Sequence, residues 1–235
     1  MTKTLITGAN KGLGFETARR LLAAGHTVYL GARDPGRGMR AAERLGARFV
    51  PLDVTDDASV AAAVKAVEAD GGLDVLVNNA GVEPRLPDGG FVPAAATTAD
   101  DVRAVFETNV FGMVRVLHAF LPLLRRSPSP VVVNVSSGLA HAPALADPRA
   151  PEHFYPGLAY PSSKAAVNML TVQYAKAFGD IRINAADPGF TATDLNHHQG
   201  TQTVEEGAEV IVRLAGIGAD GPTGTFQNAA GVLPW

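Results

Sequence analysis

The sequence predicts an α/β fold in which helices cover both faces of a mostly parallel, doubly wound sheet of seven strands. Short, continuously apolar runs recur along the chain, as buried parallel strands require. Segments with helical periodicity lie between these runs, so strands and helices alternate. A glycine-rich turn directly after the first run is the third observation, because such a turn joins a parallel strand to the helix that follows it.

Four strands are predicted in the first third of the chain, each an apolar run followed by a glycine or a polar residue. These strands are Thr4–Thr7, Thr27–Ala32, Arg48–Leu52 and Asp74–Asn78. Leu13–Ala24 follows the first strand and Ser59–Ala69 follows the third, and both repeat apolar residues with the period of a helix. We therefore expect both segments to be helices that connect parallel strands.

The same alternation continues to the end of the chain. The remaining predicted strands are Val131–Ser136, Arg182–Ala186 and Gly224–Gln227, and the remaining helices include Val102–Leu124, Ala159–Phe178 and Val204–Ala215. Residues 138–158 contain four prolines and predict an irregular loop insertion before the helix at 159. Because no linker or repeat interrupts the pattern, we expect one domain over residues 1–235.

Composition narrows the function classes. The chain is 46% hydrophobic and 18% charged, enough for a substantial core, and its formal net charge of −3 leaves no basic excess for a nucleic acid. It has no cysteine, which excludes disulfides, thiolate metal sites and a cysteine nucleophile. The apolar stretch at the N-terminus is too short for a signal sequence or a membrane span. We expect a cytoplasmic protein with a small-molecule partner, no nucleic-acid partner and no membrane partner.

The turn from Thr7 to Gly14 reads Thr-Gly-Ala-Asn-Lys-Gly-Leu-Gly. Glycines lack a Cβ, so the backbone can approach a phosphate closely, and the N-terminus of the following helix offers free N–H groups and a positive potential. The turn predicts a pyrophosphate site in a Rossmann-type domain, with a tight turn that binds nothing as the alternative.

Tyr160 is the only one of the four tyrosines that has a lysine four residues further on. On a helix these two positions share a face. A free phenol has a pKa of about 10, and an adjacent ammonium favours the phenolate, so we expect Lys164 to lower the pKa of Tyr160. The alternative is an exposed Tyr and Lys on a surface helix.

Together these motifs resemble the short-chain dehydrogenase/reductase family, in its carbonyl-reductase-like branch. The matches are the TGxxxGxG turn from Thr7, the NNAG motif at 78–81, Ser137 at the end of the fifth strand, Tyr160 with Lys164, and the Pro-Gly segment at 188–189. The resemblance covers about residues 3–194. It implies an NAD(P)-dependent enzyme that acts on CH–OH or C=O groups.

The resemblance also implies roles for single residues. The catalytic set is expected to be Asn109, Ser137, Tyr160 and Lys164. In reduction, hydride would pass from the nicotinamide to the carbonyl carbon, Tyr160 would protonate the oxygen, and Ser137 would donate a hydrogen bond to it. The cofactor-binding set is expected to be Gly8, Asn10, Lys11, Gly12, Leu13, Gly14, Arg33, Asp53, Val54, Asn79, Ala80, Gly81, Tyr160, Lys164, Pro188, Gly189, Thr191 and Thr193.

Two of these polar residues also have local interpretations. Asn109 lies inside the predicted helix 102–124, where Asn is a poor helix former, and the resemblance places it at a helix distortion, where it holds a water linked to Lys164. Asp53 corresponds to a family residue that contacts adenine, and a capping or turn role is the alternative.

The end of the second strand bears on the choice of nicotinamide. NAD sites normally carry an acid there, whereas a nearby Arg accommodates the 2′-phosphate of NADP. Here Ala32 takes the position of the acid, Arg33 follows, and Lys11 adds a second cation, so NADPH is favoured over NADH. Asp34 is expected either to face the ribose or to pair with Arg33.

Polar loops are expected to surround the substrate. Residues 194–203 correspond to the mobile substrate lid of the family. His197 and His198 suggest a metal, but adjacent side chains point apart and no partner has ligand spacing, so no metal is predicted. His141, Phe154 and Tyr155 are candidate pocket residues, with ordinary loop packing as the alternative.

The leading hypothesis is NADPH-dependent reduction of a ketone, aldehyde or quinone to the alcohol, with Tyr160 as general acid. The alternatives are an NAD-linked alcohol dehydrogenase of the same family and a non-catalytic NADP-sensing regulator. The sequence leaves open the physiological substrate, the stereochemistry, the direction of reaction and the choice between monomer and homo-oligomer.

Overall fold

Short apolar runs form one eight-stranded sheet in the computed structural model, which describes residues 1–86 and 88–235. The strands are β1 (Lys3–Ile6), β2 (Thr27–Ala32), β3 (Arg48–Pro51), β4 (Val75–Asn78), β5 (Val131–Val135), β6 (Arg182–Ala186), β7 (Phe226–Asn228) and β8 (Gly231–Leu233). The seven predicted strands are all present, with ends that differ by one or two residues. The eighth, β8, has only three residues, too few to show a period.

The order of strands across the sheet is β3-β2-β1-β4-β5-β6-β7-β8. Every neighbouring pair is parallel except β7 and β8, which pair antiparallel at the edge. β1 and β4 are neighbours although β2 and β3 lie between them in the sequence, so the winding of the sheet reverses there. This is the doubly wound topology that the sequence predicts, and ligands bind at such a reversal.

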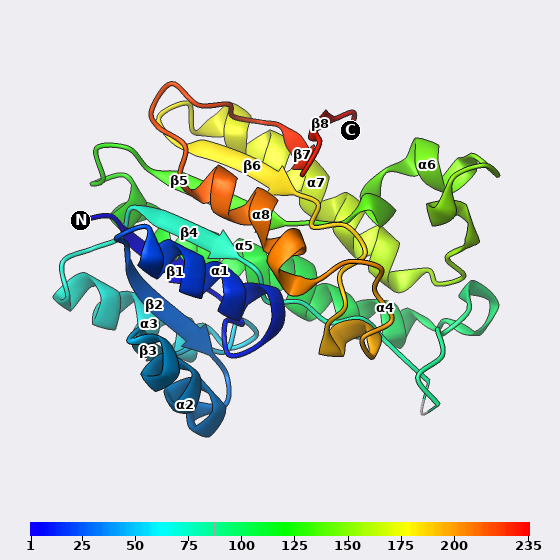
Figure 1. Cartoon of the computed structure of the whole chain (residues 1–235), viewed down its shortest axis with the longest axis horizontal. Coiled ribbons are helices and arrows are strands. Elements are labelled where there is room, and N and C mark those ends of the chain that lie inside the picture. Colours follow the sequence, from blue (N-terminus) through cyan, green and yellow to red (C-terminus); the bar gives the residue numbers. More distant parts are fainter. Residues whose placement is uncertain (87) are drawn as a thin grey trace.

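The helices lie on both faces of the sheet (Figure 1). They are α1 (Gly12–Ala23), α2 (Pro35–Leu45), α3 (Asp57–Ala69), α4 (Ala99–Phe106), α5 (Met113–Leu124), α6 (Ala142–Ala146), α7 (Ala159–Ala177) and α8 (Val204–Ala215). α1 packs against α8, and α3 packs against α5 on the opposite face, where α7 covers β6. Neighbouring strand residues alternate between these faces, so Leu5 joins the core under α3 and α5 while Ile6 joins the core under α1 and α8.

The helix α2 is absent from the sequence-based predictions because its glycines, Gly36 and Gly38, weaken the helical pattern. Local capping explains why it forms. Asp34 lies at the N-cap, and its Oδ1 accepts a hydrogen bond from the backbone N–H of Arg37 at 2.8 Å. Pro35 lies in the first turn, where the missing N–H costs nothing.

The predicted helix 102–124 is interrupted by a π-helical segment, η2 (Glu107–Gly112), between α4 and α5. Asn109 lies inside this segment, so the helix distortion implied by the resemblance is present. Within the described residues, the continuous helical run Ala99–Leu124 is the one segment long and apolar enough to span a membrane. Its α5 part buries Val116, Leu117 and Phe120 in the core, as core helices do.

Residues 138–158 are more regular than the predicted loop. They contain the short helix α6 and two 3-10 turns, η3 (Gly138–Ala140) and η4 (Pro151–Phe154). Prolines lie in the first turns of α6 and η4, where they are compatible with helical backbone. The proline pattern therefore marked helix starts as well as breaks.

Candidate active site

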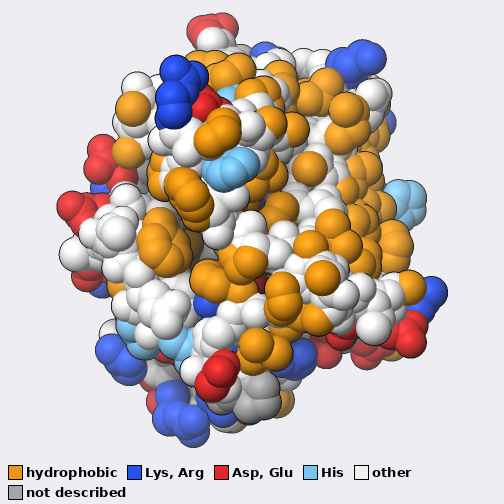
Figure 2. All heavy atoms as spheres, turned by 90° about the vertical axis from the view of Figure 1, so that its right-hand side faces the viewer, with side chains coloured by type: hydrophobic (Ala, Val, Ile, Leu, Met, Phe, Trp, Pro, Cys, Tyr) orange, Lys and Arg blue, Asp and Glu red, His pale blue; other side chains and the backbone are white. Residues whose placement is uncertain are grey.

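A cavity of about 970 Å³ opens beyond the carboxyl ends of the parallel strands. Its floor is formed by residues that directly follow β1, β4, β5 and β6. Its outer wall is formed by residues from three loop segments (82–86 with 88–91, 138–158 and 190–203), called the loop wall below. Figure 2 shows the face that carries these loops, where hydrophobic side chains gather and most charged side chains lie toward the margins. The volume is at the upper end of the usual range for ligand pockets, about 300–1,000 Å³.

The glycine turn after β1 requires its glycines. Gly8 and Gly12 have φ angles of +64° and +56°, in the left-handed region that favours glycine. A Cβ on Gly14 would lie 2.5 Å from Asn79 Nδ2 and 3.0 Å from the carbonyl oxygen of Gly8. Gly14 therefore has no room for a side chain, because it packs against Asn79 and against the start of the turn at Gly8.

Hydrogen bonds tie the turn after β1 to the turn after β4. Asn79 Nδ2 donates to the carbonyl oxygens of Thr7 and Gly8, at 2.8 and 3.2 Å. The Thr7 hydroxyl oxygen accepts hydrogen bonds from the backbone N–H groups of Asn79 and Ala80, at 3.0 and 2.9 Å. The two motifs recognised in the sequence therefore brace each other at the reversal of the sheet.

All of the residues expected to bind the cofactor line the one cavity. They start at the glycine turn, continue past Arg33 and Asp53, and end at Tyr160, Lys164 and the segment 188–193. The donor set fits a nicotinamide dinucleotide, because a close-approach glycine turn lies at a helix N-terminus at one end of the cavity and a Tyr–Lys pair lies at the other. Asn109 is the one catalytic candidate outside the lining.

The two acids near the predicted adenosine end, Asp34 and Asp53, accept hydrogen bonds from residues close by in the sequence. Asp34 caps α2 and lies 3.8 Å from the guanidinium of Arg37, so it neither pairs with Arg33 nor lines the cavity. Asp53 lines the cavity and also accepts hydrogen bonds from the N–H and hydroxyl of Thr55, at 2.9 and 2.7 Å. Burial acts to raise the pKa of Asp53, but these bonds outweigh it and leave the pKa below its usual value. Both interpretations of Asp53 are compatible with this geometry.

Tyr160, Lys164 and Ser137 meet where the end of β5 faces the first turns of α7. The Tyr160 side chain is buried and lines the cavity together with Ser137. Lys164 is also buried; its Nζ donates to the carbonyl oxygen of Val135 at 2.7 Å and lies 5.6 Å from the centroid of the Tyr160 ring. The pair is therefore part of a polar site, which contradicts the alternative of an exposed pair.

The prediction that Lys164 lowers the pKa of Tyr160 is wrong for this structure. Burial and the nearby charge of Glu83 raise the pKa of Tyr160 above its usual value, although the hydrogen bond with Ser137 opposes the rise. Burial lowers the pKa of Lys164 to about 8. The reason is the depth of the site: desolvation disfavours the phenolate and the ammonium alike, and Lys164 is hydrogen-bonded to the backbone.

Asn109 is held behind the Tyr–Lys pair by the π-helical turn. Its Oδ1 accepts a hydrogen bond from the N–H of Val82 at 2.8 Å, and its Nδ2 donates to Val82 O and Ser163 Oγ, at 2.9 and 3.0 Å. Ser163 precedes Lys164 on α7, and Val82 follows the turn after β4. Asn109 thus joins the end of β4 to the helix that carries Tyr160 and Lys164.

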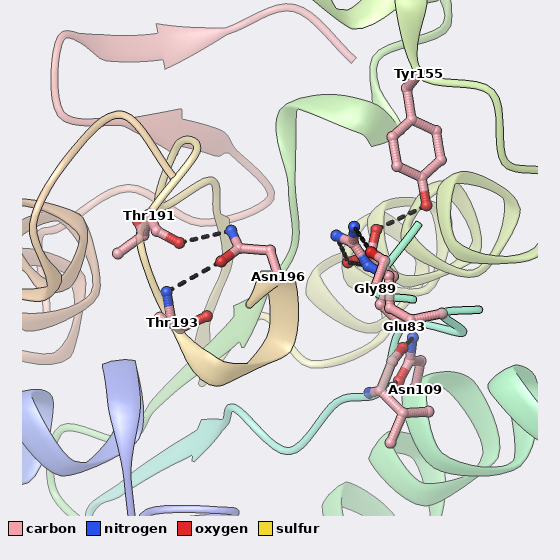
Figure 3. Close-up of polar contacts among 9 residues, drawn as sticks. Glu83, Gly89, Asn109, Tyr155, Thr191, Thr193 and Asn196 are labelled. Atoms are coloured by element: carbon pink, nitrogen blue, oxygen red, sulfur yellow. Dashed lines mark hydrogen bonds and ion pairs between the residues drawn. The ribbon is translucent and has the colours of Figure 1, made fainter. Parts of the chain in front are cut away.

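Charged residues that the sequence-based reasoning missed lie in the loop wall. Glu83 and Arg85 form an ion pair with an Nη2–Oε2 distance of 2.6 Å, and their side chains are only 5% and 7% exposed. Tyr155 donates a hydrogen bond to the second Glu83 oxygen at 2.7 Å. Figure 3 shows the Tyr155 hydroxyl directed at Glu83, above Asn109. In the sequence, both charges closely follow the NNAG motif that ends a buried strand, and this position could have indicated their place at the cavity.

The rest of the loop wall combines apolar and polar side chains. Leu139, Phe91, Phe190 and Leu195 line the cavity together with Phe154 and Tyr155, two of the three predicted pocket residues. The third, His141, is not part of the lining; it lies at the start of α6.

The segment 194–203 lies against the glycine turn. Lys11 Nζ and Asp194 Oδ2 are 2.7 Å apart, and both side chains are about half exposed. Asn196 folds the segment, because its amide donates to Thr191 O at 2.8 Å and accepts from the N–H of Thr193 at 3.1 Å (Figure 3). Asp194, Leu195, Asn196 and His197 all line the cavity.

The two histidines of this segment do not face a common centre. His198 Nε2 lies 2.9 Å from Asp194 Oδ1, whereas the ring of His197 lies beside Gly89. Among residues 1–86 and 88–235, no group of three or more His, Cys, Asp and Glu side chains is placed to hold a metal ion.

A family model described as short chain dehydrogenase matches residues 2–204 of the chain. Among curated proteins, a (+)-neomenthol dehydrogenase of Arabidopsis thaliana is 34% identical over 90% of each chain. A (−)-isopiperitenone reductase of Mentha piperita is 33% identical over 94% of each chain. Among solved structures, an NADPH-bound carbonyl reductase from chicken fatty liver superposes with a TM-score of 0.85 and 29% identity, covering 100% of this chain and 99% of that one.

Proposed function

The chain belongs to the short-chain dehydrogenase family and is an NAD(P)-dependent oxidoreductase of small molecules, and from this premise we propose that it reduces an apolar ketone, aldehyde or quinone with NADPH. The observation that carries the proposal is the placement of Ser137, Tyr160 and Lys164 in the cavity that also contains the glycine turn. A proton donor and a dinucleotide site in one cavity suit hydride transfer to a carbonyl.

The residues that would hold NADPH follow from the lining. The N–H groups of the turn from Gly8 to Gly14 would face the pyrophosphate, and Arg33 with Lys11 would face the 2′-phosphate. The capping role of Asp34 supports NADPH, because this acid is not free to bind ribose hydroxyls. When bound, the cofactor supplies the hydride.

The chain's own groups would handle the proton. Because the pKa of Tyr160 is raised, its hydroxyl is protonated at neutral pH and can donate to the carbonyl oxygen as negative charge develops there. Ser137 would donate a second hydrogen bond to that oxygen. Lys164, with a pKa of about 8, is mostly an ammonium at neutral pH and would bind the nicotinamide ribose and stabilise the phenolate left after transfer.

The nature of the loop wall supports an apolar substrate. Its aromatic and aliphatic side chains enclose the space next to Tyr160, and its one buried ion pair is neutralised internally. The relatives act, by their names, on neomenthol and isopiperitenone, and the chicken protein is a carbonyl reductase.

The test compares wild type and Tyr160→Phe with NADPH and a panel of menthone, benzaldehyde and a benzoquinone. The variant is expected to bind NADPH as wild type does, measured by cofactor fluorescence, and to lose about 100-fold or more of kcat, since a positioned general acid contributes about 10²–10⁴-fold. Tyr174→Phe, on the same helix but outside the cavity lining, is the matched control. Turnover preserved in Tyr160→Phe would refute the assignment.

A further inference from the structure

The ion pair of Glu83 and Arg85 is buried although it lies in a loop. Arg85 Nη2 and Nε donate to Glu83 Oε2 at 2.6 and 3.2 Å, and the Tyr155 hydroxyl donates to Oε1 at 2.7 Å. The guanidinium carbon of Arg85 lies 3.8 Å from the centroid of the Phe91 ring, and that ring meets Tyr155 edge-on with centroids 4.8 Å apart. Both carboxylate oxygens are therefore occupied, and both side chains are more than nine-tenths buried although they border the cavity.

Stability alone does not account for such a pair. Burying two charges costs several kcal/mol per ion, and apolar residues of similar size are often as stable or more stable (roughly 1–4 kcal/mol). The local surroundings are otherwise apolar and aromatic, so an apolar replacement would fit the chemistry of the loop wall.

The first consequence is positional. Glu83 follows the turn after β4, while Tyr155 precedes α7 by four residues, so their hydrogen bond joins the loop after β4 to the segment that leads into Tyr160. The join is reinforced nearby: a Cβ on Gly157 would lie 2.7 Å from the Tyr155 ring, and the N–H of Ala94 donates to Pro156 O at 2.9 Å. The start of α7 is thereby fixed relative to the end of β4.

The second consequence is electrostatic. Besides Ser137, the charged or titratable groups that act on Tyr160 are Glu83 and Arg85 from the loop after β4, Asp187 from the end of β6, Tyr155 from the loop before α7, and Lys164 from α7 itself. After burial, the charge of Glu83 is the largest influence that raises the pKa of Tyr160, and Arg85 opposes it more weakly. The same carboxylate opposes the burial that lowers the pKa of Lys164.

We propose that Glu83 is a positioning residue of the active site: through Tyr155 it fixes the start of α7, and together with Arg85 it sets the charge that surrounds the Tyr160 hydroxyl. This inference rests on the proposed function, because it needs Tyr160 to transfer the proton. If it is correct, the loop wall influences the relative rates of reduction and oxidation as well as substrate binding.

The test uses the reverse reaction, in which an alcohol is oxidised with NADP⁺ and its hydroxyl proton passes to ionised Tyr160. Below the pKa of Tyr160, kcat for oxidation rises with pH, so a lower pKa moves the whole profile to lower pH. The variants are Glu83→Gln, Arg85→Gln and the double variant, each of which replaces a charged side chain with a neutral polar one. The substrate pair is the best ketone or aldehyde of the panel and its alcohol, measured from pH 6 to 10.

Glu83→Gln is expected to shift the oxidation profile to lower pH by about one unit, so that oxidation at a fixed pH below the pKa of Tyr160 becomes about tenfold faster. Arg85→Gln is expected to shift the profile to higher pH, and the double variant should lie between Glu83→Gln and wild type. Tyr155→Phe removes the hydrogen bond without changing a charge, so it should lower kcat at every pH and leave the profile in place.

The outcomes separate the two proposals. Single variants whose profiles coincide with wild type, or shift in the same direction as each other, overturn the inference even where stability or kcat falls. If one single variant does not fold, the opposite-sign variant and the double variant still decide the direction. Loss of turnover in Tyr160→Phe with unmoved Glu83→Gln and Arg85→Gln profiles refutes this inference alone, whereas turnover preserved in Tyr160→Phe refutes the proposed function.

Discussion

The floor of the cavity and its loop wall are built by different means. On the floor, short side chains bond to the backbone: the Thr7 hydroxyl and the Asn79 amide tie the glycine turn to the turn after β4 through main-chain N–H and carbonyl groups. In the loop wall, larger side chains hold the structure: an ion pair and an asparagine fold their own segments, and an aromatic contact joins segments far apart in the sequence. The floor is thus fixed by the course of the strands, while the wall can change with single substitutions.

Gly14→Ala breaks the floor where it is tightest. The added Cβ would lie 2.9 Å from Ala9 Cα and 2.5 Å from the Asn79 amide, so the free energy of unfolding is expected to fall by about 1–3 kcal/mol, as for overpacked cores. NADPH affinity should fall with it. Chemical denaturation and cofactor fluorescence measure both effects.

Gly179→Ala is the matched control, because a Cβ there meets nothing within 4 Å. If Gly14→Ala matched this control in stability and in NADPH affinity, the close packing around Gly14 would not constrain the floor.

Arg33→Ala tests the end of β2, where a side chain rather than the backbone is proposed to select NADPH over NADH. Hydrogen bonds to charged groups contribute about 1.5–3 kcal/mol, so NADPH affinity should fall about 10- to 100-fold while NADH affinity stays unchanged. Arg125→Ala removes another exposed guanidinium, one that does not line the cavity, and serves as control. An equal loss for both cofactors would contradict the proposed NADPH preference and favour an NAD-linked dehydrogenase.

Phe190→Ala tests whether the wall can change without the floor. The ring lines the cavity and is 48% exposed, so its removal is expected to raise KM for an apolar ketone about tenfold and leave NADPH affinity as it is. Val232→Ala truncates an exposed apolar residue on β8, outside the cavity, and should change neither quantity. A parallel loss of NADPH affinity in Phe190→Ala would show that floor and wall act as one unit.

Asp194→Asn gives the smallest expected effect, at the point where the wall touches the glycine turn. The Lys11–Asp194 pair is about half exposed, and exposed pairs contribute about 0–1 kcal/mol. The variant frees Lys11, so NADPH affinity should rise by up to about threefold at low salt, and the difference from wild type should vanish at high salt. Fluorescence titrations at two ionic strengths measure this, and a loss of affinity would show that Asp194 supports the cofactor site.

The contrast between floor and wall also decides what the sequence could predict. Glycines that allow close approach, and strands buried on both faces, leave strong local patterns, so the family, the sheet and the residues around the turn from Gly8 follow from the sequence. Asn109 is a similar case, because a poor helix former inside a long helix indicated the distortion that the structure contains.

Other features depend on contacts that local patterns do not record. Glu83 and Arg85 are typical of a solvated loop until Phe91 and Tyr155 cover them. The raised pKa of Tyr160 results from burial and from Glu83, neither of which the Tyr-x3-Lys spacing reveals. The helix α2 forms through the Asp34 cap despite its glycines, and the pairing of β8 depends on its neighbour β7.

The π-helical turn around Asn109 has a consequence for insertions and deletions. The i→i+5 hydrogen bonds of a π-helical turn hold one residue more than the i→i+4 bonds of an α-helix, so a single deletion within 107–112 that restored regular α-helix would keep α4 and α5 nearly in phase and remove the bulge. Such a change would displace Asn109 from its contacts with Val82 and Ser163 while leaving the rest of both helices in place. The active site therefore depends on this one extra residue, and chain length in the segment is constrained as tightly as residue identity.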